Sequence, residues 1–183
     1  MAGGFAVRFS YVGENFFPRN PEAFSMNVFQ PRHRFRNIFE ITPELLRALG
    51  VEALLLDIDN TLAKHGHPRP LDGAEGWIRS MEDAGFRIMI VSNAKPERVE
   101  DFAAKVRLPF VAQGMKPLSA GFDRACRALG VAPEHAAVIG DQVFTDVLGG
   151  NLYGAMTLLV EPIEREKGRF FRLKRHLEKK ILK

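Results

Sequence analysis

The sequence predicts a three-layer, doubly wound α/β domain built around a parallel sheet. Short and nearly continuous apolar runs alternate along the chain with longer stretches of helical periodicity. Continuous apolar runs are typical of strands that are buried on both faces, as in a parallel sheet. Polar residues follow four of these runs, where the strands of such a sheet end at a binding site. Because crossovers between parallel strands are right-handed, helices are expected on both faces of the sheet.

The regular part of the chain begins near residue 40. Thr42 followed by Pro43 has the pattern of a helix N-cap and first helical residue, and Gly50 is suited to end that short helix. Five strands are expected after it, over residues 51–58, 86–91, 110–111, 136–139 and 156–160. Helices are expected between them, over residues 71–84, 96–106, 117–129 and 143–148. This order is typical of consecutive βαβ units.

Two segments flank the predicted domain, which is expected to span residues 32–162. Residues 1–31 form a Phe-rich extension, and eight of the fifteen Phe lie within residues 1–40. So many Phe argue against a simple solvated tail, so a docked arm and a poorly ordered tail both remain open. Residues 163–183 are expected to form a basic amphipathic helix, with nine Lys or Arg against three Glu.

The composition is that of an ordinary globular protein. The apolar fraction is 46% and the charged fraction 26%, and no apolar run reaches the roughly 18 residues of a membrane span. The single cysteine excludes an intrachain disulfide, and the first 30 residues lack the apolar stretch of a signal peptide, so a cytoplasmic location is expected. The net charge of +4 is local, because residues 163–183 carry +6 and residues 41–162 carry −4. The basic balance is therefore weak evidence for nucleic-acid binding.

Side chains suited to phosphoryl transfer stand at the ends of the predicted strands. The candidate residues, in chain order, are Asp57, Asp59, Thr61, Ser92, Asn93, Lys116, Asp141 and Asp146. Because the carboxyl ends of parallel strands meet at one edge of a sheet, these residues are expected to converge although they are up to 89 positions apart. Convergence after four successive strands makes a chance arrangement of caps and turns a poor explanation.

Each candidate has a chemical task in that reaction, which needs an in-line nucleophile, neutralisation of phosphate charge and a proton for the leaving group. Asp57 can attack phosphorus and form an aspartyl-phosphate. Asp59 can protonate the leaving oxygen and later deprotonate water. Ser92 and Asn93 offer polar groups to the phosphate, and Lys116 is a point charge that can pair with both nucleophile and phosphate.

A divalent cation is expected beside the nucleophile. Asp57 and Asp141, with a backbone carbonyl near Asp59, supply the hard oxygen ligands that Mg²⁺ prefers, and waters and a phosphate oxygen complete its shell. Without a cation, these carboxylates would repel a phosphate dianion.

Four short motifs resemble the signature motifs of the haloacid dehalogenase (HAD) phosphatases. They are Asp57-Ile-Asp-Asn-Thr61, Ser92-Asn93, Lys116-Pro117 and Gly140-Asp-Gln-Val-Phe-Thr-Asp146. The longer wording Phe39-Glu-Ile-Thr-Pro43, Leu56-Asp-Ile-Asp-Asn-Thr-Leu62 and Gly140 to Asn151 resembles the YqeG-type phosphatases of subclass IIIA. The resemblance covers about residues 32–162 and implies a HAD-like Rossmannoid fold.

The resemblance also implies roles, residue by residue. It implies a nucleophile at Asp57, an acid/base at Asp59, a loop brace at Thr61, phosphate contacts at Ser92 and Lys116, metal ligands at Asp57, Asp59 (through its carbonyl) and Asp141, and support from Asp146. An Asp at position 59 is the phosphatase variant of the first motif. YqeG-type proteins in turn resemble the mitochondrial phosphatidylglycerophosphate phosphatases, so a lipid phosphomonoester is one hypothesis for the substrate.

The spacing of the motifs predicts an open site. Only 35 residues separate Asp57 from Ser92, and 24 separate Ser92 from Lys116, so neither gap has room for the cap domain that many HAD enzymes carry. An open site favours a phosphate on something large, on a membrane, or sequestered by another subunit. His65 and His67 follow the first motif and are interpreted as a solvated polar loop or as contacts for a leaving group.

Several alternatives remain open at the level of the sequence. The helix over residues 163–183 can lie on an anionic membrane surface, which would place the protein on the inner membrane face, or pack on its own domain. The chain can be a nucleic-acid-end phosphatase, although no aromatic and basic platform accompanies the site. It can also be a non-catalytic, phosphorylatable or metal-binding interaction module, although Asp59 argues against a long-lived phosphoryl group. No strong signal indicates a homo-oligomer.

Overall fold

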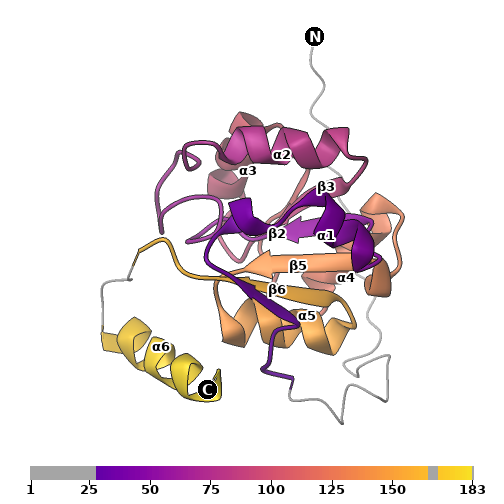
Figure 1. The fold of residues 1–183 in the computed structure, drawn as a ribbon. Coiled ribbons are helices and arrows are strands. Elements are labelled where there is room, and N and C mark those ends of the chain that lie inside the picture. Colours follow the sequence, from indigo (N-terminus) through magenta and orange to yellow (C-terminus); the bar gives the residue numbers. More distant parts are fainter. Residues whose placement is uncertain (1–27, 165–168, 183) are drawn as a thin grey trace.

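The computed structural model describes residues 28–164 and 169–182 (Figure 1). Within these ranges a six-stranded, wholly parallel sheet forms the middle layer, in the order β1-β6-β5-β2-β3-β4. The strands are β1 (His33–Phe35), β2 (Ala53–Leu56), β3 (Arg87–Val91), β4 (Phe110–Val111), β5 (Ala136–Gly140) and β6 (Met156–Val160). The predicted three-layer α/β fold is confirmed.

Helices cover both faces of the sheet. They are α1 (Pro43–Ala48), α2 (Ala74–Asp83), α3 (Pro96–Val106), α4 (Ala120–Leu129), α5 (Leu148–Tyr153) and α6 (Arg169–Ile181), with short 3₁₀ turns η2 (Ile38–Glu40) and η3 (Pro133–His135) and a π-helical turn η4 (Val143–Val147). Figure 1 shows α2 and α3 over one face and α4 and α5 over the other. No cap domain interrupts the chain between β2 and β4.

Strand β2 is buried on both faces, as its continuous apolar sequence predicts. Leu54 and Leu56 belong to the core cluster that includes Trp77 of α2, while Leu55 belongs to the cluster on the other face with Phe122 of α4. The three leucines are at most 1% exposed. Burying each contributes about 1.5–3 kcal/mol, so β2 is a rigid platform for the residues that follow it.

The sheet has its topological switch point between β2 and β5. From β2 the chain continues outward to β3 and β4, then returns to the other side of β2 to form β5 and β6. The backbone N–H of Asp57 donates to the carbonyl of Ile139 (2.9 Å), so the pairing of β2 with β5 extends to the first candidate residue. The crevice outside this point is where open α/β sheets bind ligands.

Some predicted boundaries differ from the structure. The helix expected from residue 71 begins at Ala74, because Gly73 before it adopts the left-handed conformation (φ +86°). The helix expected from residue 117 begins at Ala120, after a turn that the Leu118 N–H closes on the Met115 carbonyl (2.8 Å). The helix expected over 143–148 is instead the π-helical turn η4 followed by α5.

Strand β1 was not predicted, and it pairs with the edge strand β6. Asn151 of α5 donates from its side chain to the carbonyls of Val28 (2.8 Å) and Gln30 (2.9 Å) and accepts from the Thr157 hydroxyl (2.9 Å). These bonds attach the described part of the N-terminal segment to the domain. The remainder of the predicted Phe-rich extension, residues 1–27, lies outside the described residues. In the parts of the chain that are described, no helix has both the length and the apolar character to cross a membrane.

Candidate active site

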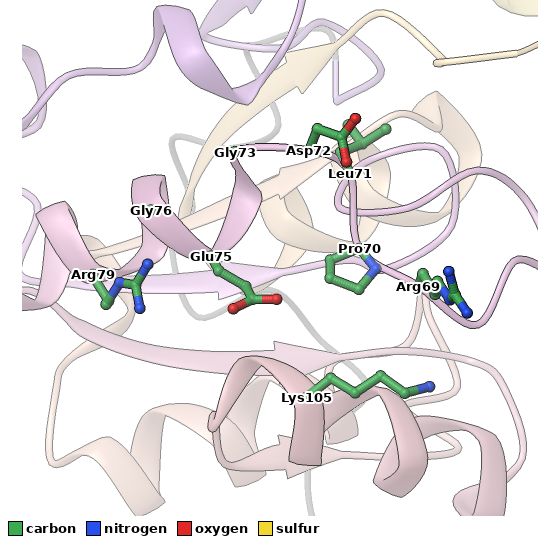
Figure 2. A pocket seen from close by; sticks show the side chains of 9 residues that line it. All are labelled: Arg69, Pro70, Leu71, Asp72, Gly73, Glu75, Gly76, Arg79 and Lys105. Atoms are coloured by element: carbon green, nitrogen blue, oxygen red, sulfur yellow. The ribbon is translucent and has the colours of Figure 1, made fainter.

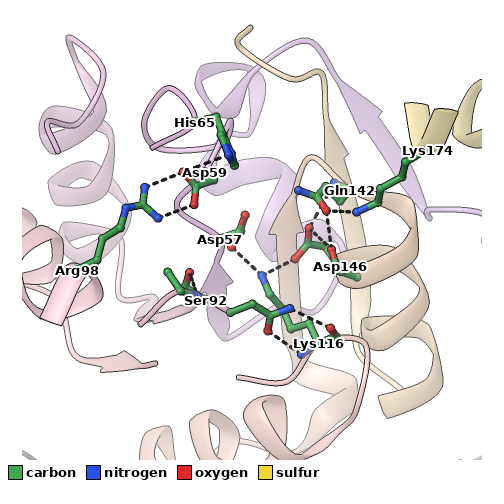
Figure 3. Close-up of polar contacts among 12 residues, drawn as sticks. Asp57, Asp59, His65, Ser92, Arg98, Lys116, Gln142, Asp146 and Lys174 are labelled. Atoms are coloured by element: carbon green, nitrogen blue, oxygen red, sulfur yellow. Dashed lines mark hydrogen bonds and ion pairs between the residues drawn. The ribbon is translucent and has the colours of Figure 1, made fainter. Parts of the chain in front are cut away.

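Lys116 joins two carboxylates at the carboxyl edge of the sheet. Its ammonium donates to Asp57 Oδ1 (2.7 Å) and to Asp146 Oδ1 (2.6 Å), and all three side chains are buried (Figure 3). Asp57 follows β2, Lys116 follows β4, and Asp146 lies in η4. The structure therefore brings together residues from three separate segments, as the sequence predicts.

Asn93 holds the backbone of Lys116. Its side-chain oxygen accepts from the Lys116 N–H (2.8 Å), and its side-chain nitrogen donates to the Lys116 carbonyl (2.9 Å). Both functional ends of the Asn93 amide are thereby engaged within the protein. The sequence assigns Asn93 to the phosphate, whereas in the structure its contact is with the loop that positions Lys116.

The pKa values of both Asp57 and Lys116 are raised in this pair. Burial raises the pKa of Asp57 to about 6, although the charge of Lys116 and its hydrogen bond act in the opposite direction. Burial alone would lower the pKa of Lys116, but the carboxylates of Asp146 and Asp57 outweigh it and hold that pKa above its ordinary value. Lys116 is therefore a permanent cation beside the candidate nucleophile.

Asp141 and Asp146 complete a cluster of three carboxylates. One ligand oxygen from each of Asp57, Asp141 and Asp146 lies within 4.8 Å of the others. Asp146 approaches because position 140 is a glycine: a Cβ on Gly140 would lie 2.3 Å from Asp146 Cγ. Asp146 Oδ2 also accepts from the Gln142 N–H (3.3 Å) within the π-helical turn, a distortion often found at functional sites.

Asp59 faces a different partner. Arg98 of α3 binds its carboxylate with two parallel hydrogen bonds (2.6 and 2.7 Å), and the Gly66 N–H donates to Oδ1 (2.7 Å). His65 Nδ1 lies 3.7 Å from the same oxygen. Burial would raise the pKa of Asp59, but these hydrogen bonds and the Arg98 charge outweigh it and lower that pKa below its ordinary value. The candidate acid/base is therefore held as a carboxylate.

Ser92 and Thr61 lie buried at the same edge. The Ser92 Oγ accepts from the Ala94 N–H (3.2 Å), at the end of β3. Thr61 is 2% exposed, and its buried hydroxyl has no hydrogen-bond partner among the described residues. Asn60, which adopts the left-handed conformation (φ +56°), turns the chain between Asp59 and Thr61. This turn keeps Thr61 close to the end of β2, whereas Ser92 follows β3.

Helix α6 reaches the site from the C-terminal segment. Arg175 donates to the backbone carbonyl of Asp141 (2.7 Å) and forms an ion pair with Asp141 Oδ2. Glu178, which is 3% exposed, accepts from the Val143 N–H (3.0 Å) and from Arg175 (2.9 Å). Lys174 bonds the side chain of Gln142. Burial raises the pKa of Asp141 well above its ordinary value, and the charge of Arg175 opposes this.

Two surface hollows are lined by residues outside the carboxylate cluster. The larger, about 590 Å³, lies between the segment that precedes α2 and the end of α3, where Arg69, Arg79 and Lys105 alternate with acidic side chains (Figure 2). The smaller, about 400 Å³, is lined by Arg98, His67 and Lys105 among others. Asp57, Asp141 and Asp146 line neither hollow. Of these two hollows, the smaller is lined by Arg98, the partner of Asp59.

Comparison with known proteins identifies the family. The model of the haloacid dehalogenase-like hydrolases matches residues 10–154. The chain belongs to this family. It is also 38% identical over 154 residues to a Bacillus subtilis (strain 168) protein named "Probable phosphatase YqeG", a match that covers 84% of this chain and 90% of the relative. The predicted resemblance to HAD-type enzymes of the YqeG kind is confirmed.

Two solved structures share the fold. A HAD family hydrolase from Deinococcus radiodurans R1, solved with bound phosphate and sodium, aligns with a TM-score of 0.55 over 73% of this chain and 89% of its own, at 16% identity. An uncharacterized protein from Listeria monocytogenes serotype 4b aligns with a TM-score of 0.53 over 64% of this chain and 85% of its own, at 18% identity. These likenesses support the HAD-like Rossmannoid architecture.

The residues of this HAD hydrolase fit a divalent cation. Three carboxylates converge at one point, and Asp141 Oδ1 is buried without a hydrogen-bond partner among the described residues. A buried carboxylate oxygen without a donor is costly unless a cation or water satisfies it. Hard oxygen donors of this kind suit Mg²⁺ and similar ions.

Three site contacts in this HAD hydrolase were not predicted from the sequence. Arg98, Arg175 and Glu178 each bind a candidate residue or the turn that contains one. Arg98 follows Ser92 by only six residues, and a cation near the start of the helix after the second motif is a weak local signal. The sequence signal for the α6 contacts is weak: Glu178 is the one acidic residue within residues 169–181, three positions after Arg175.

Proposed function

We propose that the chain is a Mg²⁺-dependent phosphomonoesterase that acts through an aspartyl-phosphate on Asp57. The supporting observation is the position of the Asp57 carboxylate, which lies at the switch point of the sheet and accepts from Lys116 at 2.7 Å, beside Asp141 and Asp146. A buried nucleophile with an adjacent fixed cation is suited to attack a phosphate group that is itself negatively charged.

In the first half-reaction, a carboxylate oxygen of Asp57 attacks phosphorus and the bond to the leaving oxygen breaks. Asp59 gives its proton to the leaving alcohol. In the second, Asp59 takes a proton from water, the water oxygen attacks phosphorus, and the bond to Asp57 breaks. Inorganic phosphate leaves and both carboxyl groups return to their starting states. Lys116 and Ser92 bind the phosphate oxygens, and Thr61 braces the loop.

The Asp59 carboxylate of the structure is the form that the second half-reaction needs. The first needs the protonated form, so the pairing with Arg98 has to weaken when substrate arrives. An incoming phosphate dianion favours protonation of Asp59 in two ways. Its negative charge competes with Asp59 for Arg98, and it raises the proton affinity of the nearby Asp59 carboxylate. Arg98 and the adjacent hollow of about 400 Å³ are suited to receive the part of the substrate beyond the phosphate.

We assign the cation to Asp57, Asp141 and the backbone carbonyl of Asp59, with Asp146 in support. When bound, Mg²⁺ neutralises charge on the carboxylates and on the transferring phosphate. Asp146 orients Lys116 through its 2.6 Å bond, which keeps the ammonium on the nucleophile rather than in the metal site.

We further propose a phosphate on a large or lipid molecule, such as phosphatidylglycerophosphate, as the substrate. The absence of a cap between β2 and β4 supports this, since nothing within the described domain encloses a small substrate. On α6, Lys179, Lys180 and Leu177 are exposed, with Leu177 at 43%, so part of this basic helix is available to an anionic membrane surface. A cytoplasmic protein bound peripherally to the inner face would meet such lipids.

Hydrolysis of an aryl phosphate by purified protein tests the chemistry. Wild type, Asp57→Asn and the surface control Asp72→Asn are compared in Mg²⁺ and in EDTA. The proposal predicts turnover by wild type and by Asp72→Asn that requires Mg²⁺, and none by Asp57→Asn. Equal rates for wild type and Asp57→Asn would exclude Asp57 as nucleophile. A stable phosphate adduct on Asp57 without turnover would favour a phosphorylatable interaction module.

Competition between substrates tests the lipid. The kcat/KM for a phosphatidylglycerophosphate in anionic vesicles is compared with that for soluble sugar and nucleotide phosphates and for a 5′-phosphorylated oligonucleotide. The proposal predicts the highest value for the lipid. A soluble phosphate or a nucleic-acid end that is turned over far faster would exclude it.

A further inference from the structure

We propose that helix α6 is part of the active site, with Arg175 as the residue that positions Asp141 for the cation and Glu178 as the residue that secures Arg175. This inference rests on the metal-dependent function proposed above. It assigns a task to the C-terminal helix that differs from membrane contact.

Arg175 contacts Asp141 at two points. It donates to the backbone carbonyl at 2.7 Å and forms an ion pair with Oδ2. The Asp141 side chain is fully buried, and Oδ1 is left without a hydrogen-bond partner among the described residues. These two contacts therefore fix the rotation of the carboxylate and leave one of its oxygens for the cluster that Asp141 forms with Asp57 and Asp146. A planar guanidinium is suited to this two-point contact, whereas an ammonium is not.

Glu178 ties the same helix to the turn that bears Asp146. One carboxylate oxygen accepts from Arg175 (2.9 Å), and the other accepts from the Val143 N–H (3.0 Å), where the π-helical turn η4 begins. The Glu178 side chain is 4% exposed, so these bonds are shielded from water. One turn of α6 thus holds both Asp141 and the start of the segment that presents Asp146.

The end of α6 is anchored independently of these ionic contacts. Ile181 and Leu182 pack against the buried cluster of Val143, Val147 and Leu159. Arg34 of β1 donates to the Leu182 carbonyl (2.7 Å). The anchor means that Arg175 does not have to order the helix by itself, so its loss is expected to affect the carboxylate more than the docking of α6.

The charges explain why a cation partner is needed at this position. Asp57, Asp141 and Asp146 bring three negative charges within 4.8 Å, and the Lys116 ammonium donates to two of these described carboxylates, Asp57 and Asp146. Without Arg175, Asp141 would be a buried carboxylate without its ionic partner. Such a group is costly to keep in place, and a carboxylate that turns away from the cluster is lost as a metal ligand. Partners that orient a ligand typically alter metal affinity about 10–100-fold.

Calorimetric titration of metal-free protein with Mg²⁺, without substrate, tests the inference. The variants are Arg175→Ala, Arg175→Lys and Glu178→Gln, with Lys179→Ala as an exposed control on the same helix, and thermal unfolding in EDTA checks their folding. We expect Mg²⁺ binding to weaken about 10–100-fold in Arg175→Ala and less in Arg175→Lys and Glu178→Gln. Lys179→Ala is expected to bind as wild type does. The Mg²⁺ concentration for half-maximal hydrolysis should rise in the same order.

The possible outcomes separate the inference from the proposed function. Unchanged or tighter Mg²⁺ binding by a folded Arg175 variant would overturn the inference alone, and tighter binding would show that Arg175 competes with the cation. If Arg175→Ala does not fold, unchanged binding by Arg175→Lys and Glu178→Gln would overturn it equally. A wild-type protein that binds no Mg²⁺ would overturn both the inference and the metal-dependent function.

Discussion

Asn93 and Lys116 are joined by two hydrogen bonds in opposite directions, from the Lys116 N–H to Asn93 Oδ1 (2.8 Å) and from Asn93 Nδ2 to the Lys116 carbonyl (2.9 Å). The amide thus pairs with the backbone of a residue 23 positions later, as a neighbouring strand would. This pairing links the end of β3 to the loop after β4 at the point where the Lys116 side chain turns towards Asp57. Asn93 therefore holds the backbone from which that ammonium extends.

Replacement of Asn93 by Ala should displace Lys116. Loss of two hydrogen bonds is expected to reduce the free energy of unfolding by about 1–3 kcal/mol and kcat by about 10–100-fold. Asn93→Asp keeps the acceptor for the Lys116 N–H and should lie between Ala and wild type. Steady-state kinetics and thermal unfolding measure both effects. The control is Ser119→Ala in the segment that bears Lys116, since the Ser119 side chain makes no cap hydrogen bond to α4. An unaltered kcat in Asn93→Ala would show that Lys116 is positioned by other contacts.

Gly140→Ala should damage the site without touching a charged residue. The added methyl would lie 2.3 Å from Asp146 Cγ, so Asp146 and the ammonium that it holds must move. A shift of about 1 Å at a catalytic group can cost about 100-fold in rate, and this is the expected loss in kcat. Gly76→Ala is the matched control, because no atom lies within 4 Å of its added methyl. Gly140→Ala with normal activity would mean that the position of Asp146 is not needed.

Arg98→Ala should alter stability in a way that depends on pH. The pKa of Asp59 lies below its ordinary value of 3.8 in the folded protein, so the carboxylate stabilises the fold above about that pH and ceases to do so as pH falls further. The wild type should therefore exceed Arg98→Ala in free energy of unfolding at pH 6, and the difference should shrink as pH falls below 3.8. Urea unfolding across that range measures it, with the exposed Arg79→Ala as control. A difference that stays constant with pH would contradict the assignment of Asp59 as the titrating partner.

Asp57→Asn should show the opposite dependence in metal-free protein. The pKa of Asp57 is raised from 3.8 to about 6, so its ionisation costs stability progressively as pH rises between those values. The amide cannot ionise, so Asp57→Asn should melt higher than wild type at pH 7.5, and the gap should close below pH 6. Thermal unfolding in EDTA measures this. A gap of the same size at pH 4 and pH 7.5 would show that ionisation of Asp57 is not its cause.

The strands could be predicted from the sequence because burial on both faces leaves an apolar run. Residues 53–56 and 136–140 are almost wholly buried, and no partial exposure blurs their pattern. Strand β1 lacks that signal, since it is a three-residue strand at the edge of the sheet in which two basic residues, His33 and Arg34, precede Phe35. It pairs with β6, where His33 lies opposite Leu158, and local periodicity does not register a partner 125 positions later.

The candidate site shows a similar division. Asp57, Lys116 and Asp141 were predicted because each follows a strand, and parallel strands bring their ends together. The contacts of Arg98 and Arg175 come from helix faces, where a charged residue is ordinarily solvated, so composition alone does not distinguish them from surface residues. The π-helical turn was predicted as an ordinary helix, because the longer bond from the Val147 N–H to the Gln142 carbonyl (3.2 Å) has no sequence signature.

Phosphorylation of Asp57 during turnover can be detected by reductive trapping. Asp59→Asn is mixed with an aryl phosphate and Mg²⁺, because such a leaving group needs little protonation while the second half-reaction still lacks its base. Quenching and reduction with borohydride convert an aspartyl-phosphate to homoserine, which peptide mass spectrometry detects. If Asp57 is the nucleophile, homoserine is expected at position 57 in Asp59→Asn and none in Asp57→Asn. Release of the aryl alcohol with an unmodified Asp57, or with homoserine at another aspartate, would contradict it.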